Sequence, residues 1–327
     1  MKLNPHPAGQ NTANVPTMDE ETVPGVQHKY RETALVFPKA GQTCHSYCTF
    51  CFRWPQFVGL NDLKFATDQA KTFVHYLKQQ KQITDVIFTG GDPMVMNSKI
   101  FSQFIDPLLE PGLAHIQNIR IGSKSLGYWP RKFIDEDDSE KMLDIFRKVT
   151  NSGKHLAFMA HFSHHRELET ELCQQAVKKI QSTGAVIRSQ SPVLRHINDD
   201  SNVWLKMWQM QLQQGIVPYY MFVERDTGPK EYFSIPLVKA YELYTSAVRR
   251  ISGLGRTVRG PSMSAFPGKV CVEGVDTIHG EKVIILKFLQ ARNAEHCYKP
   301  FFAKYDPEAT WLDQLQPAFS QSKFFWE

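Results

Sequence analysis

Short hydrophobic runs alternate along the chain with longer amphipathic segments. The runs are rich in β-branched and aromatic residues and end in polar or glycine-containing turns, which is typical of buried strands. We expect strands at ALVF (34–37), DVIFTG (85–90), NIRIGS (118–123), LAFMAHF (156–162), AVIRSQS (185–191) and PYYMFV (218–223). In the intervening segments and after the last run, hydrophobic positions recur every three to four residues, which predicts helices over 66–80, 98–110, 137–151, 166–182, 199–214 and 236–251.

Strands that alternate with helices predict βαβ units and therefore an α/β protein with a parallel sheet, either doubly wound or barrel-like. In both arrangements ligands bind beyond the carboxyl ends of the strands. Polar and glycine-containing motifs follow those ends in this chain, namely TGGD, GSKS, AHFSHH, SQS and ERD. We therefore expect one site that is assembled from the loops of all six strands.

Both ends of the chain lack this alternation. Residues 1–27 form an arm without periodicity, residues 28–257 contain the βα units, and residues 258–327 form a C-terminal segment that we expect to cover the site. That segment starts rich in glycine and proline, continues in a hairpin-like strand, HGEKVIILKF (279–288), and ends in an aromatic tail. We expect the tail to pack over the barrel, with a dimer contact as the alternative; its aromatic residues are Phe301, Phe302, Tyr305, Trp311, Phe319, Phe324, Phe325 and Trp326.

The composition is that of a globular protein, with 327 residues of which 42% are hydrophobic and 22% charged. No run of about 18 apolar residues is present, so we expect no membrane-spanning segment. The polar, proline-rich start has no apolar core of a secretory signal, and a cytoplasmic location is the expectation. The net charge of +5 is scattered along the chain. It therefore indicates no nucleic-acid surface, but it suits small anionic substrates.

Half of the six cysteines lie in CHSYCTFC (44–51), as Cys44, Cys48 and Cys51. In a reducing compartment such a cluster indicates metal binding or catalysis rather than disulfides. One interpretation is a zinc site with a distant fourth ligand. Another is a cubane iron–sulfur cluster whose fourth iron stays open, and accidental clustering is the third. No second C-x2-C or H-x3-H pair supports zinc, and no role is assigned to the other cysteines, which are Cys173, Cys271 and Cys297.

The C-x3-C-x2-C spacing, with Phe50 before the last cysteine, resembles the cluster motif of the radical S-adenosylmethionine (SAM) enzymes. The resemblance implies a partial (β/α)6 barrel of the TIM type over residues 28–257, with a C-terminal extension. It also implies a [4Fe–4S] cluster whose open iron binds SAM, which is cleaved to a 5′-deoxyadenosyl radical. FTGGDP (88–93) follows the second strand, where these enzymes have a GGE-like turn. There Asp92 would accept a hydrogen bond from the SAM amino group.

Further motifs resemble the lysine 2,3-aminomutase family and occur in its order: HKY (28–30), CTFCFR (48–53), GGDP (90–93), RIGS (120–123), HFSHH (161–165), SQSPVLRHIND (189–199), PYY (218–220) and EKVIILKF (281–288). VPG before HKY looks like the short branch that acts on a lysine of elongation factor P. The resemblance implies an isomerase in which SAM and pyridoxal phosphate (PLP) act together. The substrate is bound as a PLP aldimine, loses a hydrogen to the radical, and its nitrogen migrates from C2 to C3. An electron donor such as flavodoxin or ferredoxin is implied too, and the oligomeric state is left open.

Carried over residue by residue, the resemblance assigns the site. Lys269 in FPGK would bind PLP covalently, Lys29 would lie near the PLP phosphate, and Arg53 would hold the substrate α-carboxylate with its bidentate fork. The cluster ligands would be Cys44, Cys48 and Cys51, and the SAM contacts Gly90, Gly91, Asp92, Ser123, His161 and Gln190. The plain alternatives are a solvated lysine in a Gly/Pro loop and an ordinary strand-end histidine.

The chain departs from the family where lysine-specific members have two aspartates that hold the distal ammonium of the substrate. Arg225 (in FVERD) and Arg259 (in TVRGP) occupy the matching positions. Guanidinium groups repel an ammonium and bind a carboxylate or phosphate. We therefore expect an anionic substrate rather than lysine. The alternative is that both arginines pair with acidic neighbours, namely Glu224, Asp226 or Glu273.

Two other functions stay open. One is a PLP-independent radical SAM enzyme on the same fold, which would catalyse dehydrogenation, epimerisation or rearrangement. The other is a non-enzymatic zinc or iron–sulfur protein. GGDP and SQS at the strand ends argue against the second, because a metal-binding module needs neither.

Overall fold

The computed structural model describes residues 4–226 and 228–327, and one eleven-stranded sheet runs through it in the order β13-β12-β11-β10-β9-β8-β7-β6-β5-β4-β3. The strands are β1 (Thr17–Met18), β2 (Glu21–Thr22), β3 (Val26–Tyr30), β4 (Thr33–Val36), β5 (Asp85–Phe88), β6 (Asn118–Ser123), β7 (His155–His161), β8 (Val186–Val193), β9 (Val217–Val223), β10 (Arg259–Ser264), β11 (Gly268–Ile278), β12 (Glu281–Ala291) and β13 (Pro300–Lys304). The α-helices are α1 (Ala70–Gln79), α2 (Ser98–Ile105), α3 (Ser125–Tyr128), α4 (Ser139–Asn151), α5 (Glu171–Gln181), α6 (Ser201–Gln213), α7 (Lys230–Phe233) and α8 (Leu237–Val248).

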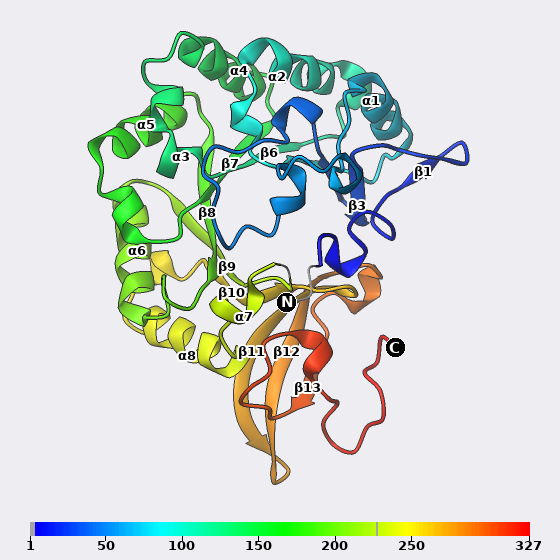
Figure 1. Ribbon diagram of the computed structural model, residues 1–327, viewed down its shortest axis with the longest axis vertical. Coiled ribbons are helices and arrows are strands. Elements are labelled where there is room, and N and C mark those ends of the chain that lie inside the picture. The colour runs from blue at the N-terminus through cyan, green and yellow to red at the C-terminus, as the bar shows by residue number, and fades with distance from the viewer. Residues whose placement is uncertain (1–3, 227) are drawn as a thin grey trace.

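Neighbouring strands from β4 to β10 are parallel, and they curve into an open arc with the longer helices on its outside (Figure 1). This is a partial TIM-like barrel, so the predicted fold class is confirmed. The predicted strands appear as β4 to β9, with ends shifted by two residues at most. The sequence pattern missed β10, because Gly260 and Pro261 interrupt it and its register with β9 shifts within the strand.

The helices agree with the hydrophobic pattern except at their ends. The predicted helix 98–110 ends at Ile105 and continues as a 3-10 turn that contains Pro107, which has no N–H for an α-helical hydrogen bond. The predicted helix 166–182 begins at Glu171 instead. The hydroxyl of Thr170 accepts a hydrogen bond from the backbone N–H of Cys173 there and caps the helix.

Residues of the parallel strands alternate between the two faces of the sheet. On β6, Ile119 and Ile121 are buried in the main hydrophobic core under the helices, whereas Arg120 is on the concave face and forms an ion pair with Asp85 of β5. Strands of a doubly wound sheet are hydrophobic on both faces. The alternation therefore leaves a concave face with polar side chains, which can receive a polar ligand.

The two ends of the chain extend the sheet with antiparallel strands. β3 pairs with β4 at one edge, and β11, β12 and β13 continue from β10 at the other. The β11–β12 hairpin turns at His279 and Gly280, both with positive φ. The aromatic tail packs against these strands in a second hydrophobic cluster that includes Phe301, Trp311 and Phe324, not over the main core of the barrel. Among the described residues, no helix combines the length and apolarity that crossing a membrane requires.

Candidate active site

The cysteine loop follows β4 and lies on the concave side of the arc (Figure 1). Its shape depends on local hydrogen bonds: the backbone N–H of Cys51 donates to the carbonyl of Cys48 at 3.0 Å, and Ser46 Oγ lies 3.0 Å from Cys48 Sγ. The Phe50 ring lies 6.0 Å from the ring of His161 at the end of β7. The loop is therefore packed against the carboxyl end of the barrel, where the sequence predicted a site.

The donor set of this loop fits an iron–sulfur cluster. Cys44, Cys48 and Cys51 are free thiols, and soft thiolates are the ligands that such clusters take. Burial raises the pKa of Cys44, and it raises that of Cys51 to about 12, so these thiols need a positive partner to ionise. No group of three His, Cys, Asp or Glu side chains in 4–226 and 228–327 is already arranged around a common metal position.

The remaining cysteines lie apart from this loop. Cys173 is on α5 in the main hydrophobic core, and Cys271 is on β11 and buried. Cys297 packs against the second hydrophobic cluster. Cys173 fills apolar space as a small hydrophobic residue does, whereas Cys271 lines a cavity together with Glu273 and Lys287.

The GGDP turn after β5 is packed directly against the start of the cysteine loop. A Cβ atom at Gly91 would overlap the carbonyl oxygen of Thr43, and one at Gly90 would overlap the side chain of Gln42. The backbone N–H of Asp92 donates to the same Thr43 carbonyl at 2.8 Å. The two glycines thus allow the turn to hold the segment from which Cys44 emerges.

Asp92 is 2% exposed, and its carboxylate accepts hydrogen bonds from several groups of the chain itself. Met94 and Lys124 donate through their backbone N–H groups at 3.0 Å each, Ser123 through its hydroxyl at 2.7 Å, and Tyr128 through its hydroxyl at 3.1 Å. Burial raises the pKa of Asp92, and these bonds oppose that shift. The Ser123 side chain faces the helix layer rather than the concave face, so it and Asp92 bind each other. Their predicted contact with SAM stays a prediction.

His161 at the end of β7 is paired with Gln190, which lies three residues before the end of β8, and both lie on the concave face. Burial lowers the pKa of His161 well below its usual value, and the nearby Lys124 lowers it further. The imidazole is therefore neutral at pH 7, and its Nε2 lies 3.1 Å from Ser163 Oγ. His161 thus lies against the cysteine loop through Phe50, and Gln190 is its neighbour on β8.

Four predicted cationic residues gather on one side of the site. Arg53 NH1 donates to Gln10 Oε1 at 3.0 Å, Arg225 NH2 lies 3.4 Å from the carbonyl of Ser264, and Lys29 Nζ donates to the carbonyl of Ala265. The guanidinium carbons of Arg53 and Arg225 lie 4.8 Å and 5.1 Å from the centre of the same ring, that of Phe52.

Lys269, the fourth of these residues, lies near the head of β11, with Nζ 4.2 Å from the centre of the Tyr220 ring. Burial lowers the pKa of Lys269 to about 7, and the charge of Arg120 contributes. Burial likewise lowers the pKa of Lys29 to about 6, and Arg225 contributes there. Both amines are thus much less protonated near pH 7 than exposed lysines are.

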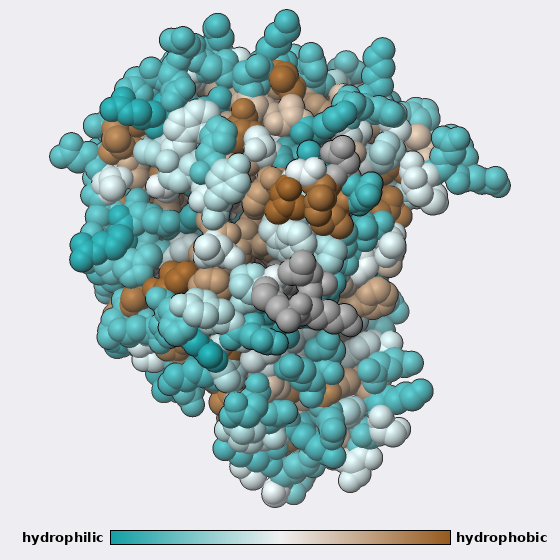
Figure 2. All heavy atoms as spheres, in the orientation of Figure 1, coloured by the Kyte–Doolittle hydropathy of each residue, from teal (hydrophilic) through white to brown (hydrophobic). Residues whose placement is uncertain are grey.

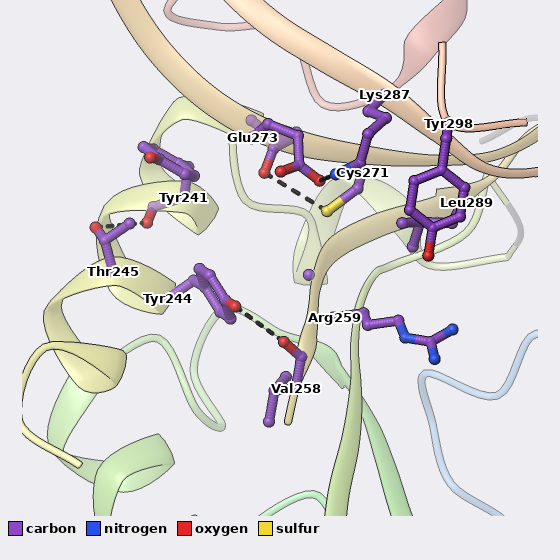
Figure 3. A pocket seen from close by; sticks show the side chains of 12 residues that line it. Tyr241, Tyr244, Thr245, Val258, Arg259, Cys271, Glu273, Lys287, Leu289 and Tyr298 are labelled. Atoms are coloured by element: carbon purple, nitrogen blue, oxygen red, sulfur yellow. Dashed lines mark hydrogen bonds and ion pairs between the residues drawn. The ribbon is translucent and has the colours of Figure 1, made fainter. Parts of the chain in front are cut away.

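The acidic neighbours of the arginines have other partners or none. Asp226 lies 3.6 Å from Lys230, Glu273 lies 3.2 Å from Lys287, and both carboxylate oxygens of Glu224 are buried without a hydrogen-bond partner. Figure 3 shows the Glu273–Lys287 pair with the guanidinium of Arg259 directed away from it. Within the described residues, no ion pair joins Arg225 or Arg259 to any of these acids. The alternative that the acids neutralise the arginines is therefore not supported.

Arg259 does not join the other arginines. It is the first residue of β10, whereas Ser264, to which Arg225 donates, is the last. Five residues of strand span roughly 16 Å. The Arg259 guanidinium lies instead 5.1 Å from the centre of the Tyr219 ring.

Two residues that the sequence pattern did not single out complete this side of the site. Gln10 belongs to the aperiodic arm, and Arg292 follows β12. Arg292 and Arg225 line a cavity of about 670 Å³ together with aromatic side chains of the C-terminal segment such as Trp311 and Trp326. The hydrophobic pattern of a strand gives no signal for a residue just beyond its end, and an arm without periodicity gives none for its contacts.

An open parallel barrel whose first carboxyl-end loop carries C-x3-C-x2-C is the architecture of a radical SAM enzyme. A putative L-lysine 2,3-aminomutase of Aquifex aeolicus is 32% identical to the chain over 302 residues, which are 92% of this chain and 77% of that protein. The chain belongs to the lysine 2,3-aminomutase family of radical SAM enzymes. Membership implies an isomerase-type enzyme with a [4Fe–4S] cluster and SAM.

Other relatives are more distant. The L-lysine 2,3-aminomutases of Escherichia coli and Clostridium subterminale are each 25% identical to the chain, over 71% and 72% of it. The chain spans 63% and 53% of the lengths of these two proteins. A scan against protein-family models gives no match.

Solved structures of similar shape include a radical SAM methyltransferase from Sphaerobacter thermophilus, with a TM-score of 0.48 and 13% identity over 72% of this chain and 68% of its own. Streptococcus suis SuiB bound to S-adenosylmethionine has a TM-score of 0.45 and 12% identity, over 67% of this chain and 47% of its own.

Proposed function

We propose that the protein is a radical SAM aminomutase that uses PLP and moves the amino group of an amino acid with an anionic side chain between C2 and C3. The observation that carries this proposal is the pair of arginines at Phe52. Arg53 and Arg225 lie on one ring, and no carboxylate of the described chain is paired with either. Guanidinium groups without a partner carboxylate are suited to bind anions of a ligand.

The separation of these arginines suits a short substrate with two carboxylates. Their guanidinium carbons are 4.8 Å and 5.1 Å from the same ring centre, so the sum of these distances, about 10 Å, is the largest separation they can have. Arg53 would hold the α-carboxylate and Arg225 the side-chain anion. A lysine substrate would instead place its ammonium near Arg225, where like charges repel.

When bound, the cluster and SAM would supply a hydrogen-abstracting radical after reduction by a donor such as flavodoxin or ferredoxin, and PLP would supply a ring that delocalises an unpaired electron. Cys44, Cys48 and Cys51 would hold the cluster. Lys269 would attach PLP, because its lowered pKa leaves much of the amine unprotonated and therefore nucleophilic at neutral pH. Lys29, on the neighbouring edge of the site, would face the PLP phosphate.

Lys269→Ala tests the PLP assignment. We expect the wild-type protein incubated with PLP to gain the visible absorbance of lysine-bound PLP, which borohydride fixes to Lys269, and the variant to lose it. Lys304→Ala, an exposed lysine on β13, is the matched control and should keep the absorbance. Catalytically competent protein that binds no PLP would contradict the assignment and favour a PLP-independent radical SAM reaction on the same fold.

Separate pools of acidic and basic amino acids test the substrate class. The reconstituted enzyme, supplied with SAM, PLP and reductant, should convert an acidic amino acid to its β-isomer and leave lysine unchanged. Arg225→Asp should lower turnover of the acidic substrate at least tenfold, because it replaces an attractive charge by a repulsive one. Turnover of lysine by the wild type, with no acidic amino acid converted, would contradict the proposal.

A further inference from the structure

Gln10 lies directly against Arg53 although it is 43 residues away in the sequence. Its side chain is 4% exposed, and its Oε1 accepts a hydrogen bond from Arg53 NH1 at 3.0 Å. A guanidinium has donors and no acceptor, so only the oxygen of the amide can face it. The amide nitrogen of Gln10 is therefore not engaged by the guanidinium.

Two donors at this contact have no partner within the described chain. Gln10 Nε2 and Arg53 Nε are both buried and make no hydrogen bond. A buried donor without an acceptor costs folding free energy, so such a donor usually has a partner, which at an active site can be a ligand. Both unpartnered groups are donors and one carries a positive charge, so the ligand that fits them supplies acceptors and a negative charge.

The backbone conformation of the arm places Gln10 beside Arg53. Ala8 and Gly9 both have positive φ, and the backbone N–H of Asn14 donates to the carbonyl of Gly9 at 2.9 Å, which closes the loop around Gln10. The carbonyl of Gln10 accepts from Gln27 Nε2 at 2.6 Å.

Arg292 fastens the same loop to the far end of the sheet. It donates to the carbonyls of Ala8 and Ala13 and to the side chain of Asn14, and also to the carbonyl of Phe266 at 2.8 Å. The loop is thus attached at several points, and Gln10 is a buried residue through which it contacts Arg53.

We propose that Gln10 is a substrate-binding residue: its amide N–H group and the guanidinium of Arg53 together bind the α-carboxylate of the amino acid. The arm is then part of the active site. The inference rests on the proposed function for the presence of an α-carboxylate at Arg53, and it does not depend on the charge of the substrate side chain.

Calorimetric titration of the enzyme, loaded with cluster, SAM and PLP but without reductant, tests this role. We expect Gln10→Ala and the volume-conserving Gln10→Met to bind L-glutamate about tenfold more weakly than the wild type. Binding of 4-aminobutyrate, which is glutamate without the α-carboxylate, should stay the same. Where 4-aminobutyrate binds too weakly for calorimetry, its inhibition constant against glutamate is measured instead.

Gln79→Ala, an exposed glutamine on α1, is the matched control and should change neither affinity. Equal losses for glutamate and 4-aminobutyrate would assign Gln10 a merely structural role, and unchanged glutamate affinity would exclude any role. If the wild type binds lysine rather than glutamate, the acidic-substrate proposal fails on its own. The same comparison is then made with lysine and 1,5-diaminopentane, which lacks the carboxylate.

Discussion

Glu224 shows how strongly a single buried carboxyl next to the site can affect stability. It is 5% exposed, neither oxygen has a hydrogen-bond partner, and burial raises its pKa to about 8. An exposed glutamate in the unfolded chain ionises near pH 4.3. Between these values the folded state holds a proton that the unfolded state has released, so the free energy of unfolding should fall as the pH rises from about 4.3 to about 8.

Glu224→Gln should remove most of this fall. We expect the variant to be more stable than the wild type by roughly 1 kcal/mol at pH 5 and by roughly 4–5 kcal/mol at pH 8. Denaturant unfolding of the ligand-free protein at both pH values measures the difference. Glu231→Gln, on the exposed side of α7, should show no such dependence on pH. Equal effects of the two substitutions would mean that Glu224 is ionised in the folded protein.

Single residues were predictable where a motif fixes their chemistry. The spacing of the cysteines and the family resemblance of the GGDP turn and of Arg53 predicted their roles, and the structure brings these residues to one end of the barrel. Gln10 could not be found in this way, because one glutamine in an aperiodic arm has no pattern and its contact with Arg53 joins residues 43 positions apart. Arg259 begins β10, and its guanidinium lies 5.7 Å from the centre of the Tyr220 ring that Lys269 also contacts, so its role in substrate binding stays a prediction.

The turn between β5 and α2 is the element that joins the two halves of the predicted cofactor site. Gly91→Ala should destabilise it by roughly 1–3 kcal/mol, because the new methyl group has to displace the backbone of Thr43. The same displacement moves the segment that leads into Cys44, so the iron content after reconstitution should fall as well.

Thermal melting and iron analysis of Gly91→Ala check both effects. Gly253→Ala is a suitable comparison, because a Cβ there has no heavy atom within 4 Å and the backbone φ is not positive. If Gly91→Ala melted at the same temperature as Gly253→Ala and kept its iron, the prediction that Gly91 is needed for close packing of the turn against the cysteine loop would be wrong.

Elements were predicted well where hydrophobic periodicity alone decides them. β4 to β9 and the main helices each bury one face in the same core, so their pattern is strong. β10 was missed because Gly260 and Pro261 hide its pattern. The positions of the antiparallel strands β11, β12 and β13 beside β10 depend on which segments pair with each other. Hydrophobic periodicity within one segment carries no information about that pairing.

At the scale of the whole molecule, hydrophobic side chains lie exposed on the side where Figure 1 draws the cysteine loop and the segment after it (Figure 2). In the segment after the cysteines, Val58 and Leu60 are 45% and 59% exposed. The rest of the view is largely hydrophilic, as expected of a barrel covered by amphipathic helices. The hydrophobic pattern of the sequence predicted the sheet and the helices that cover it, but not which hydrophobic side chains remain exposed near the cysteine loop.

The hydrogen bond that Arg292 donates to the side chain of Asn14 joins positions 278 residues apart. Closing so long a stretch of flexible chain would cost roughly 5 kcal/mol in entropy. Once the sheet has formed, both partners are already near each other, so the arm should dock last and at little further cost. It should also be the first part to detach, because its release breaks a few hydrogen bonds and leaves the barrel intact. We therefore expect the proposed amino-acid substrate to enter and leave when the arm is detached. The rate at which the hydrogen bonds between Arg292 and the arm break would then limit the rate of substrate and product exchange.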